Sequence, residues 1–543
     1  MGLNKSPQNS LPWGRFFAAA VGGLLLSAGF APLGIEAAAW IGPGVILFSA
    51  LGTANGRAFQ IGYVGGMVHF VSSLYWLIHM PFTWHGIPLA PAAGWLALSA
   101  YCALFPAIWV WLCWKLLNGT SLSDFLATPR LRRIGWALAA GALWTALEYV
   151  RGLFLTGFPW NFVGASQYHM LPLIQIASIT GIYGVSFLVV WTSVSLADAT
   201  LRMSRQPSRQ SMWANAGLPL LVVIGTAGYG VARISSFPQP ARELKVAMIQ
   251  PSIPQTLIWD PEADKARFQD VLSLSAKALA EKPQLLLWPE SAVPDLTAEL
   301  QQTIGQLARQ HHAWIVFCAS TSQPTTTDAP AFFNSALLCN PDGDLESVYN
   351  KRRLVIFGEY VPLSHWLPFL KWLTSVGYDL TPGERPVDFQ IENPSAKISA
   401  LICFEDMFPQ EARAHVGPDT DFLVNLTNDG WFGHGPEQWQ QAASGIFRAI
   451  ENGVPLVRCT NDGLTCWADA CGRVRQIFGQ PGNVYGPGFM TAEIPLRSPG
   501  DHSQTFYNLH GDWFPLGCAS LGLAALILPL TQKRPVPPSS IVG

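Results

Sequence analysis

Charged residues are scarce in this sequence. Only 13% of the 543 residues are Asp, Glu, Lys or Arg, and the formal net charge is −2, whereas 50% of the residues are hydrophobic. This balance excludes both a nucleic-acid-binding footprint and an acidic tail. At this length it also argues against a single globular core and points toward a membrane protein.

Metal-ligand spacing is missing as well. The cysteines and histidines form no pattern that is typical of a metal site. The adjacent pair His311 and His312 lies at the polar end of a predicted helix, where surface histidines are expected. The sequence therefore predicts neither a metal ion nor another cofactor.

Apolar runs of about the length that a bilayer requires are plentiful. We expect seven transmembrane helices before residue 235, at roughly 15–31, 36–54, 58–79, 88–114, 134–152, 172–198 and 214–233, and an eighth at about 512–531. The first run has the alternative of a cleaved signal peptide. The predicted organisation is a membrane domain at 1–234, a large domain at 242–505, the eighth helix at 510–532 and a tail at 533–543.

Basic residues are distributed unevenly between the predicted loops. With the N-terminus inside, the inside-facing segments collect most of them, including Arg130, Arg132 and Arg133, whereas the short outside loops hold only Arg151. By the positive-inside rule the C-terminus is then cytoplasmic. The large domain is expected outside, in a periplasm if the cell has one.

Residues 242–505 alternate between short apolar runs and amphipathic stretches. Helices are expected at 263–282, 298–312 and about 437–451, and strands at 244–250, 283–290, 314–320, 332–340, 345–351, 398–403, 421–427 and 454–460. Mixed strands with helices outside them suggest two packed sheets under two helical layers.

Three reactive side chains each stand at the end of a predicted strand: Glu290, Lys351 and Cys403. A thiol at the end of a core strand has the geometry of a nucleophile elbow, although a lone cysteine can also be a small buried apolar residue. Together the three suit thiol acyl transfer. The glutamate takes the thiol proton, the ammonium lowers the thiol pKa and stabilises the oxyanion, and the thiolate forms the covalent intermediate.

The same residues carry a family resemblance. WPES, the lysine before FGEYVP, and ICFED, in this order, resemble the nitrilase (carbon-nitrogen hydrolase) superfamily. The downstream segment is similar to the membrane-embedded branch of that superfamily, the apolipoprotein N-acyltransferases, through LTNDGWFG and then Arg448, Ala449, Glu451, Arg458 and Asn461-Asp462-Gly463. The resemblance covers nearly the whole chain, because the hydrophobic flanks match too.

This resemblance implies both a fold and an activity. The fold is a multi-pass α-helical membrane domain plus an α/β nitrilase-like αββα sandwich. The activity moves a fatty acyl chain from a phospholipid, through a thioester on Cys403, to the α-amino group of the S-diacylglyceryl N-terminal cysteine of a lipoprotein. The implied location is a bacterial inner membrane, with the catalytic domain periplasmic.

Two other functions stay open at this point. A membrane-tethered amidase of the nitrilase type would use the same Glu290, Lys351 and Cys403 with water as acceptor, but a simple tether needs only one span. A catalytically inactive lipid-binding scaffold is the other, and the presence of all three reactive side chains argues against it.

The resemblance extends to supporting residues. Glu359 and Glu405 match acids that orient the lysine and the incoming groups, and Phe404 stands where a tyrosine often follows the cysteine. Trp259 matches a family tryptophan near the site, with a structural tryptophan as the alternative. The family commonly has a Gln-His pair after NDxWFG, whereas the segment GHGPEQWQQ of this chain has no histidine at the place of that pair.

The segment after Glu359 is strongly apolar. Its cluster is Trp366, Leu367, Phe369, Leu370, Trp372 and Leu373, with one charge at Lys371. It is expected either to dip into the membrane interface or to pack against the spans. Both placements favour an acyl-chain substrate, so Trp366, Phe369 and Trp372 are candidate substrate-binding residues. Trp431 and Arg448, in the downstream segment that carries the resemblance, are further candidates.

Two further features concern the membrane part and the cysteines. Glu148 and Arg151, ahead of the GFPW stretch, are expected to form a helix-end pair or to line a lipid entrance. In the outside domain, Cys466 and Cys471 could bridge across a predicted hairpin.

Overall fold

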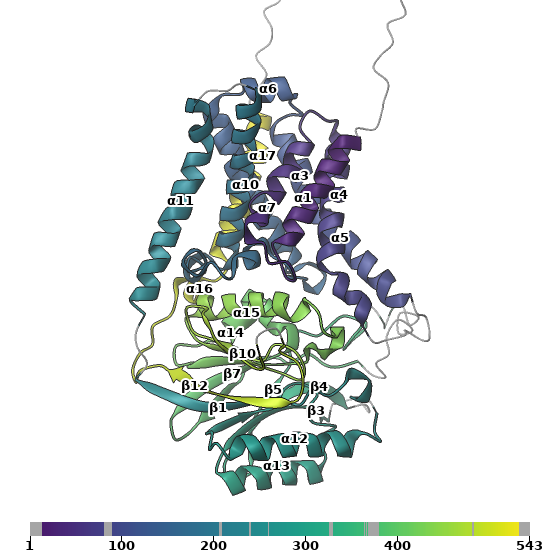
Figure 1. The fold of residues 1–543 in the computed structure, drawn as a ribbon, viewed down its shortest axis with the longest axis vertical. Coiled ribbons are helices and arrows are strands. Elements are labelled where there is room, and N and C mark those ends of the chain that lie inside the picture. The colour runs from purple at the N-terminus through teal and green to yellow at the C-terminus, as the bar shows by residue number, and fades with distance from the viewer. Residues whose placement is uncertain are drawn as a thin grey trace, which may run out of the picture.

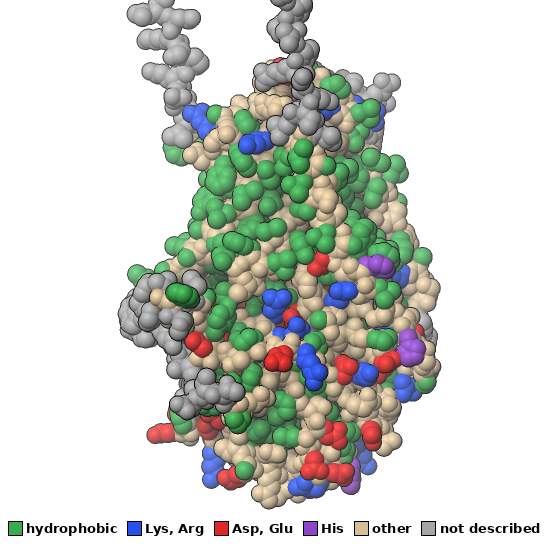
Figure 2. Space-filling view, turned by 180° about the vertical axis from the view of Figure 1, so that it is seen from behind, with side chains coloured by type: hydrophobic (Ala, Val, Ile, Leu, Met, Phe, Trp, Pro, Cys, Tyr) green, Lys and Arg blue, Asp and Glu red, His purple; other side chains and the backbone are tan. Residues whose placement is uncertain are grey.

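The molecule consists of a helical part and a two-sheet part stacked along its long axis, as the computed structural model shows (Figure 1). The structure describes residues 13–80, 89–205, 209–237, 241–258, 260–324, 330–362, 364, 366, 379–480 and 483–531. Hydrophobic side chains cover the helical part, and charged side chains cluster on the two-sheet part and at the opposite end (Figure 2).

Both ends of the described chain contribute to the helical part. Its helices are α1 (Trp13–Ala28), α2 (Glu36–Ala39), α3 (Gly42–Ser49), α4 (Asn55–Ser73), α5 (Ala90–Leu116), α6 (Leu122–Ala127), α7 (Arg130–Arg151), α8 (Leu171–Ile174), α9 (Ala177–Thr180), α10 (Ile182–Arg205), α11 (Arg209–Ser235) and α17 (Trp513–Thr531). Short 3₁₀ segments are η1 (Tyr75–His79), η2 (Phe154–Thr156) and η3 (Val163–Gln167).

Helices α5 and α10 and residues Asn215–Ser235 of α11 are long and apolar enough to cross a membrane by length and composition. Four shorter apolar stretches also occur among the described residues, at Trp13–Ala28, Glu36–Ser49, Leu171–Thr180 and Trp513–Ile527. Every predicted span overlaps at least one helix, while the count of eight crossings stays a prediction.

Glycines allow a close helix crossing and a helix break in the helical part. Helices α1 and α4 cross where a Cβ on Gly23 would lie 2.2 Å from the carbonyl oxygen of Gly65, which is the close approach that small residues allow. Gly181 has φ +66°, and a Cβ there would lie 2.7 Å from the ring of Tyr507. The predicted span 172–198 is therefore wrong in its bounds, because the helix breaks at Gly181 and the long helix runs over Ile182–Arg205.

Two six-stranded sheets form the second part. One has the order β12 (Gly488–Leu496), β1 (Arg242–Gln250), β2 (Leu285–Leu287), β3 (Trp314–Gln323), β4 (Ala331–Cys339), β5 (Leu345–Asn350). The other has the order β11 (Val474–Ile477), β10 (Cys466–Ala468), β9 (Leu456–Thr460), β8 (Phe422–Thr427), β7 (Ala396–Ile402), β6 (Asp388–Ile391). The central strands β1–β2–β3 and β7–β8–β9 are parallel, and they are the continuous apolar runs expected of strands covered on both faces.

The two sheets face each other across a core built from residues such as Val246, Leu287, Ile398 and Val424. Helices α12 (Asp264–Leu279) and α13 (Ala298–His311) cover the outer face of the first sheet (Figure 1). Helices α14 (Pro409–Ala414) and α15 (Glu437–Asn452) lie between the second sheet and the helical part, beside α16 (Phe506–His510). The predicted αββα sandwich joined to an apolar helical domain is confirmed.

The structure does not contain the disulfide that the sequence allows between Cys466 and Cys471. All nine are free thiols. Cys466 does not bridge to Cys471, because it packs in an apolar cluster with Ala442, Leu464 and Val484.

Candidate active site

The nucleophile candidate, Cys403, directly follows strand β7 and begins a 3₁₀ turn, η6 (Cys403–Met407). Its φ is +56°, a conformation that a residue with a Cβ adopts only when its surroundings hold it there. The Cys403 carbonyl accepts hydrogen bonds from Asn425 Nδ2 at 2.8 Å and Gln441 Nε2 at 3.1 Å. The half-buried thiol therefore stands on a fixed, strained turn, which is the elbow geometry that the sequence predicts.

Three charged side chains converge beside the elbow. Lys351 Nζ lies 2.8 Å from Glu359 Oε1 and 3.6 Å from Glu290 Oε1. Asn334 Nδ2 donates to both carboxylates, at 2.8 Å to Glu290 and 3.2 Å to Glu359. The lysine is almost completely buried, so its charge is balanced within the site rather than by water.

The electrostatics favour a protonated thiol in the free protein. Burial raises the pKa of the Cys403 thiol well above its usual value, the Glu290 carboxylate raises it further, and Lys351 only partly opposes them. Burial also raises the pKa of Glu290, against the effect of Lys351. For Lys351, burial lowers the pKa, but Glu359, Cys403 and Glu290 outweigh it, so the pKa is raised and the ammonium persists.

The two supporting acids have different positions. Glu359 contacts Lys351 directly and accepts the Val355 N–H at 2.8 Å. The Glu405 carboxylate is instead buried and accepts four donors, from Tyr349 Oη (2.9 Å), Arg352 N (2.7 Å), Arg353 N (3.0 Å) and Ile402 N (2.8 Å). Glu405 therefore connects the residues that follow Lys351 to the end of strand β7, directly before Cys403.

Phe404 belongs to an aromatic wall beside Cys403. Its ring centroid lies 5.7 Å from Lys351 Nζ and 5.2 Å from the Phe408 ring. The wall continues into the helical part through Phe70, Trp76 and Trp160. The backbone N–H of Phe404 also hydrogen-bonds toward the Cys403 sulfur. Cys403 thus has beside it an apolar wall that it shares with the helical part, and a backbone donor within reach.

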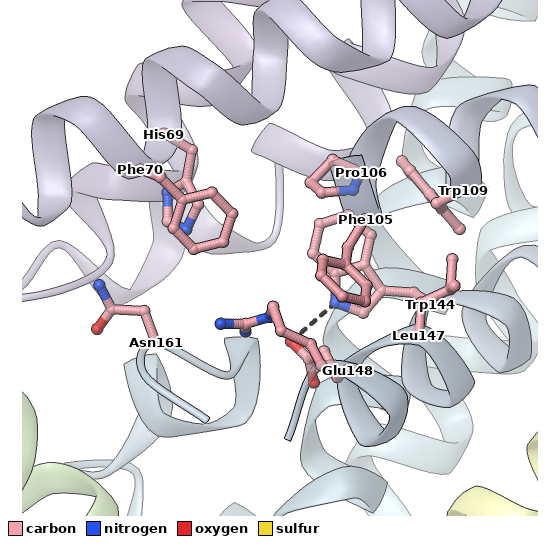
Figure 3. A pocket seen from close by; sticks show the side chains of 10 residues that line it. His69, Phe70, Phe105, Pro106, Trp109, Trp144, Leu147, Glu148 and Asn161 are labelled. Carbon is pink, nitrogen blue, oxygen red and sulfur yellow. Dashed lines mark hydrogen bonds between the residues drawn. The ribbon is translucent and has the colours of Figure 1, made fainter. Parts of the chain in front are cut away.

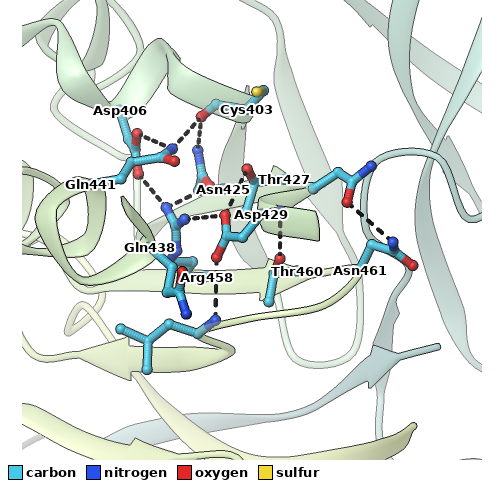
Figure 4. A network of polar contacts seen from close by, with 12 residues as sticks. Cys403, Asp406, Asn425, Thr427, Asp429, Gln438, Gln441, Arg458, Thr460 and Asn461 are labelled. Atoms are coloured by element: carbon cyan, nitrogen blue, oxygen red, sulfur yellow. Dashed lines mark hydrogen bonds and ion pairs between the residues drawn. The ribbon is translucent and has the colours of Figure 1, made fainter. Parts of the chain in front are cut away.

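A buried ionic network supports the elbow from below (Figure 4). Arg458 lies 2.8 Å from Asp406 Oδ2 and 2.6 Å from Asp429 Oδ1. Gln441 Nε2 donates to Asp406 Oδ1 at 2.8 Å as well as to the Cys403 carbonyl. Burial raises the pKa of Asp406 to about 6, although Arg458 lowers it.

The neighbouring residue on α15, Gln440, points the other way, toward the helical part. Its Oε1 accepts the indole N–H groups of Trp76 (3.2 Å) and Trp160 (2.8 Å). Its Nε2 donates to the carbonyls of Ala31 (2.8 Å) and Ser73 (3.1 Å). One amide thus joins three separate segments of the helical part to the helix that also holds the nucleophile turn.

Replacing Gln440 by leucine is expected to destabilise the protein. The change leaves two indole donors and two carbonyls without their buried partner, at roughly 1–3 kcal/mol or more of unfolding free energy. Thermal unfolding of the detergent-solubilised protein measures it. Gln476→Leu, on the exposed strand β11, is the matched control and is expected to change stability by less than about 0.5 kcal/mol. Equal effects of the two substitutions would contradict the role given to Gln440.

The remaining candidates that the structure describes are Trp366, Trp431 and Arg448. Trp366 is 80% exposed, and Trp431 is half-buried on η7 (Asp429–Phe432). Arg448 is fully buried and pairs at 3.0 Å with Glu451, whose carboxylate also accepts the Ile182 N–H at 2.8 Å. That position favours a structural role between the two domains over the predicted substrate contact. Trp259, Phe369 and Trp372 lie outside the described residues.

Glu148 and Arg151 both hold the loop that follows α7. Glu148 accepts the N–H groups of Trp144 and Val163, at 2.9 and 2.7 Å, and Arg151 donates to the carbonyls of Phe158 and Trp160, at 2.9 and 2.7 Å. The two residues, with His69 and Asn161, line a cavity of about 20 Å³ (Figure 3). Among the residues that the structure describes, no group of three or more His, Cys, Asp or Glu side chains is placed to hold a metal ion.

Known proteins resemble the chain over nearly its full length. It is 33% identical over 534 residues to the apolipoprotein N-acyltransferase of Geobacter metallireducens, covering 97% of each chain. The chain belongs to the apolipoprotein N-acyltransferase family. A Vibrio vulnificus member of this family is 30% identical over 513 residues, covering 92% of this chain and 94% of its own.

The two parts of this family member match separate family models. Residues 22–195 match the apolipoprotein N-acyltransferase N-terminal domain, and residues 245–495 match carbon-nitrogen hydrolase. Among solved structures, an amidase from Nesterenkonia sp. is similar at 19% identity and a TM-score of 0.36, covering 48% of this chain and 94% of its own. Family membership makes the chain a bacterial membrane protein of the carbon-nitrogen hydrolase superfamily.

Proposed function

We propose that the protein transfers a fatty acyl chain from a phospholipid, by way of a thioester on Cys403, to the α-amino group of the S-diacylglyceryl N-terminal cysteine of a lipoprotein. The placement of the thiol carries this proposal. Cys403 interacts with the Glu290 carboxylate and the Lys351 ammonium, and the next residue, Phe404, belongs to an aromatic wall shared with apolar helices. A water-soluble amide has no need of such a wall, whereas an acyl chain coming from a bilayer does.

In the first step Glu290 removes the thiol proton as the sulfur attacks an ester carbonyl of the phospholipid. The developing oxyanion is stabilised by the Lys351 ammonium and the Phe404 N–H. The ester C–O bond then breaks, and the leaving alkoxide takes the proton from Glu290. A lysophospholipid departs, and the acyl chain remains as a thioester on Cys403.

In the second step the lipoprotein amine attacks the thioester carbonyl, and Glu290 accepts the proton that the amine loses. The same two donors stabilise the oxyanion. The C–S bond breaks, an amide forms, and the thiolate regains its proton from Glu290. The two substrates therefore react in turn, in a ping-pong order.

We infer an inner-membrane location with the catalytic domain in the periplasm. The arginines at the start of α7 support this orientation, because they lie at the end of the helical part away from the two sheets (Figure 1). Positive residues of this kind favour the cytoplasmic side. Eight membrane crossings then return the C-terminus to the cytoplasm.

Mass spectrometry of the purified protein after incubation with phospholipid vesicles tests the function. We expect a fatty-acyl adduct on the Cys403 peptide of the wild type, its absence from Cys403→Ala, and its discharge by a diacylglyceryl-cysteine peptide. Ammonia release from small amides, with no adduct on the wild type, would instead make the protein an amidase.

A further inference from the structure

Two arginines that directly follow the lysine of the site share one carboxylate. Arg352 Nη1 contacts Glu411 Oε1, and Arg353 Nε lies 3.2 Å from Glu411 Oε2. Burial raises the pKa of Glu411, but the hydrogen bond and charge of His415, together with both arginines, outweigh it and hold that pKa below its usual value. Glu411 therefore stays ionised, and the arginine pair keeps a surplus of positive charge.

Both guanidinium groups remain open to solvent. The Arg352 and Arg353 side chains are 25% and 33% exposed, whereas Glu411 is 3% exposed. Each guanidinium carries five N–H donors, and the contacts with Glu411 use one nitrogen of each. The solvent-exposed N–H groups of the two arginines can therefore bind a second anion while the contacts with Glu411 remain.

Exposed apolar side chains place this pair at the depth of lipid headgroups. On one side, Phe154 and Leu155 are 55% and 64% exposed, on the loop whose Gly157 packs against the Phe408 ring. The Arg353 guanidinium lies 5.1 Å from that same ring. Apolar side chains exposed where a helical membrane domain meets a soluble one are typical of the bilayer interface.

Apolar side chains are also exposed on the other side of the arginine pair. Helix α16 and the start of α17 expose Phe506, Leu509 and Trp513. They are joined to α14, the helix of Glu411, because Arg413 Nε donates to the Asn508 carbonyl at 2.7 Å. The arginine pair thus lies between two apolar surfaces rather than on the distant, polar end of the two-sheet domain.

The pair is also connected to the nucleophile by the aromatic wall. Lys351 Nζ lies 5.7 Å from the Phe404 ring, the Phe404 and Phe408 rings are 5.2 Å apart, and Phe408 lies 5.1 Å from Arg353. Arg353 and the Lys351 ammonium of the site therefore lie at opposite ends of two adjoining rings. A phospholipid has its phosphate and its ester carbonyls separated by a short glycerol bridge.

We propose that Arg352 and Arg353 bind the phosphate group of the phospholipid and so hold its ester carbonyl at Cys403. Arginine suits this role, because its planar fork of donors matches phosphate oxygens in a bidentate geometry. The proposal rests on the proposed function for the reaction that follows, but the binding site itself is defined by the two side chains and their position.

The test compares two acyl donors that carry the same esters. Loading of Cys403 is followed against the concentration of phosphatidylethanolamine or of diacylglycerol, which lacks phosphate. In Arg352→Gln/Arg353→Gln we expect the half-saturating phospholipid concentration to rise about tenfold or more, since charged hydrogen bonds are lost. Loading from diacylglycerol is expected to stay at the wild-type level, because the backbone bonds of both residues to Glu405 remain.

Two further variants sharpen the comparison. Glu411→Gln removes the competing carboxylate and is expected to lower the half-saturating phospholipid concentration, an effect opposite to that of damage. The matched control is Arg309→Gln, on α13 at the far end of the two-sheet domain (Figure 1). This substitution is expected to leave the loading of Cys403 from both lipids unchanged. Native mass spectrometry of the detergent-solubilised protein provides a readout without turnover, and fewer retained phospholipids are expected in the double variant.

The experiment distinguishes a failure of the phosphate site from a failure of the proposed function. If the double variant slows loading from diacylglycerol as much as from phospholipid, the arginines act by positioning Lys351, and the phosphate site is overturned. Unchanged half-saturation together with unchanged phospholipid retention overturns it as well. If the wild type takes an acyl chain from neither donor, the proposed function fails, and the retention measurement alone decides the phosphate site.

Discussion

Glu290→Gln is expected to lower the rate of acyl loading at Cys403 by about 10²–10⁴-fold at neutral pH, the usual contribution of a positioned general base. The reason is the protonation state of the free site. Burial and Glu290 itself raise the pKa of the Cys403 thiol, so the sulfur carries its proton until a base removes it. The amide of glutamine keeps the size of the side chain and cannot accept that proton.

The rate of acyl loading in Glu290→Gln is expected to rise with pH. Without the base, loading depends on the small thiolate fraction, which grows about tenfold for each pH unit below the thiol pKa. The rate of Glu290→Gln is therefore expected to climb with pH more steeply than the rate of the wild type. Rates of thioester formation between about pH 6 and 9 measure this.

The matched control for that experiment is Glu299→Gln, on the first turn of α13, which is expected to load normally. Iodoacetamide labelling serves as a check on the thiol. Because the substitution removes a charge that raises the thiol pKa, labelling of Cys403 in Glu290→Gln is expected to be at least as fast as in the wild type. Normal acyl loading by Glu290→Gln would exclude Glu290 as the base.

Arg458→Met is expected to destabilise the catalytic domain by about 3–5 kcal/mol, the cost of leaving buried charges without their partner. Arg458 is 1% exposed and lies between Asp406 and Asp429, and both carboxylates would remain in the same buried place. Asp406 in turn is bound by Gln441, which holds the Cys403 carbonyl. Acyl loading should therefore fall even at temperatures where the variant stays folded.

The loss of stability in Arg458→Met is expected to grow with pH. With Arg458 present, burial already raises the pKa of Asp406 to about 6, and removal of the cation raises it further. The native state then binds a proton that the unfolded state, with an aspartate pKa of about 4, has released. Stability consequently falls as pH rises through this range, so the defect is smaller at pH 5 than at pH 8.

Thermal unfolding in detergent at these two pH values measures the effect. Arg473→Met is the control, since its pair with Asp469 is partly exposed at 3.6 Å, and such a pair contributes about 0–1 kcal/mol. A defect in Arg458→Met no larger than in Arg473→Met, or one that shrinks with rising pH, would contradict the role assigned to the network.

The candidate residues Glu290, Lys351 and Cys403 can be predicted from the sequence because each stands at the end of a predicted strand. Glu290 and Cys403 follow apolar runs, whereas Lys351 follows a strand of mixed polar and apolar residues. Asn334, which bridges two carboxylates of the site, was missed because it lies inside a strand, where an isolated amide has many structural explanations. Its signal in the sequence is the polar pair Asn334-Ser335 within an otherwise apolar run.

The residues that join the two domains were missed for a different reason. Gln440 and Gln441 lie on a helix whose periodicity was predicted correctly, but a polar helix face is ordinarily interpreted as solvent-facing. Here both faces are covered, and periodicity does not reveal what covers a polar side chain. The same limit applies to Arg448, which the resemblance makes a candidate for substrate binding and whose partner in the structure is Glu451.

The burial of α15 has a consequence for any attempt to separate the two domains. Every residue of this helix except Trp439 is buried, and the hydrogen-bond partners of the Gln440 side-chain amide all lie in the helical part. A water-soluble fragment spanning residues 242–505 would expose this helix together with its unpaired amide, and would tend to aggregate. Producing the catalytic domain on its own would require a redesigned outer face for α15, so structural and inhibitor studies should use the full chain in detergent or lipid.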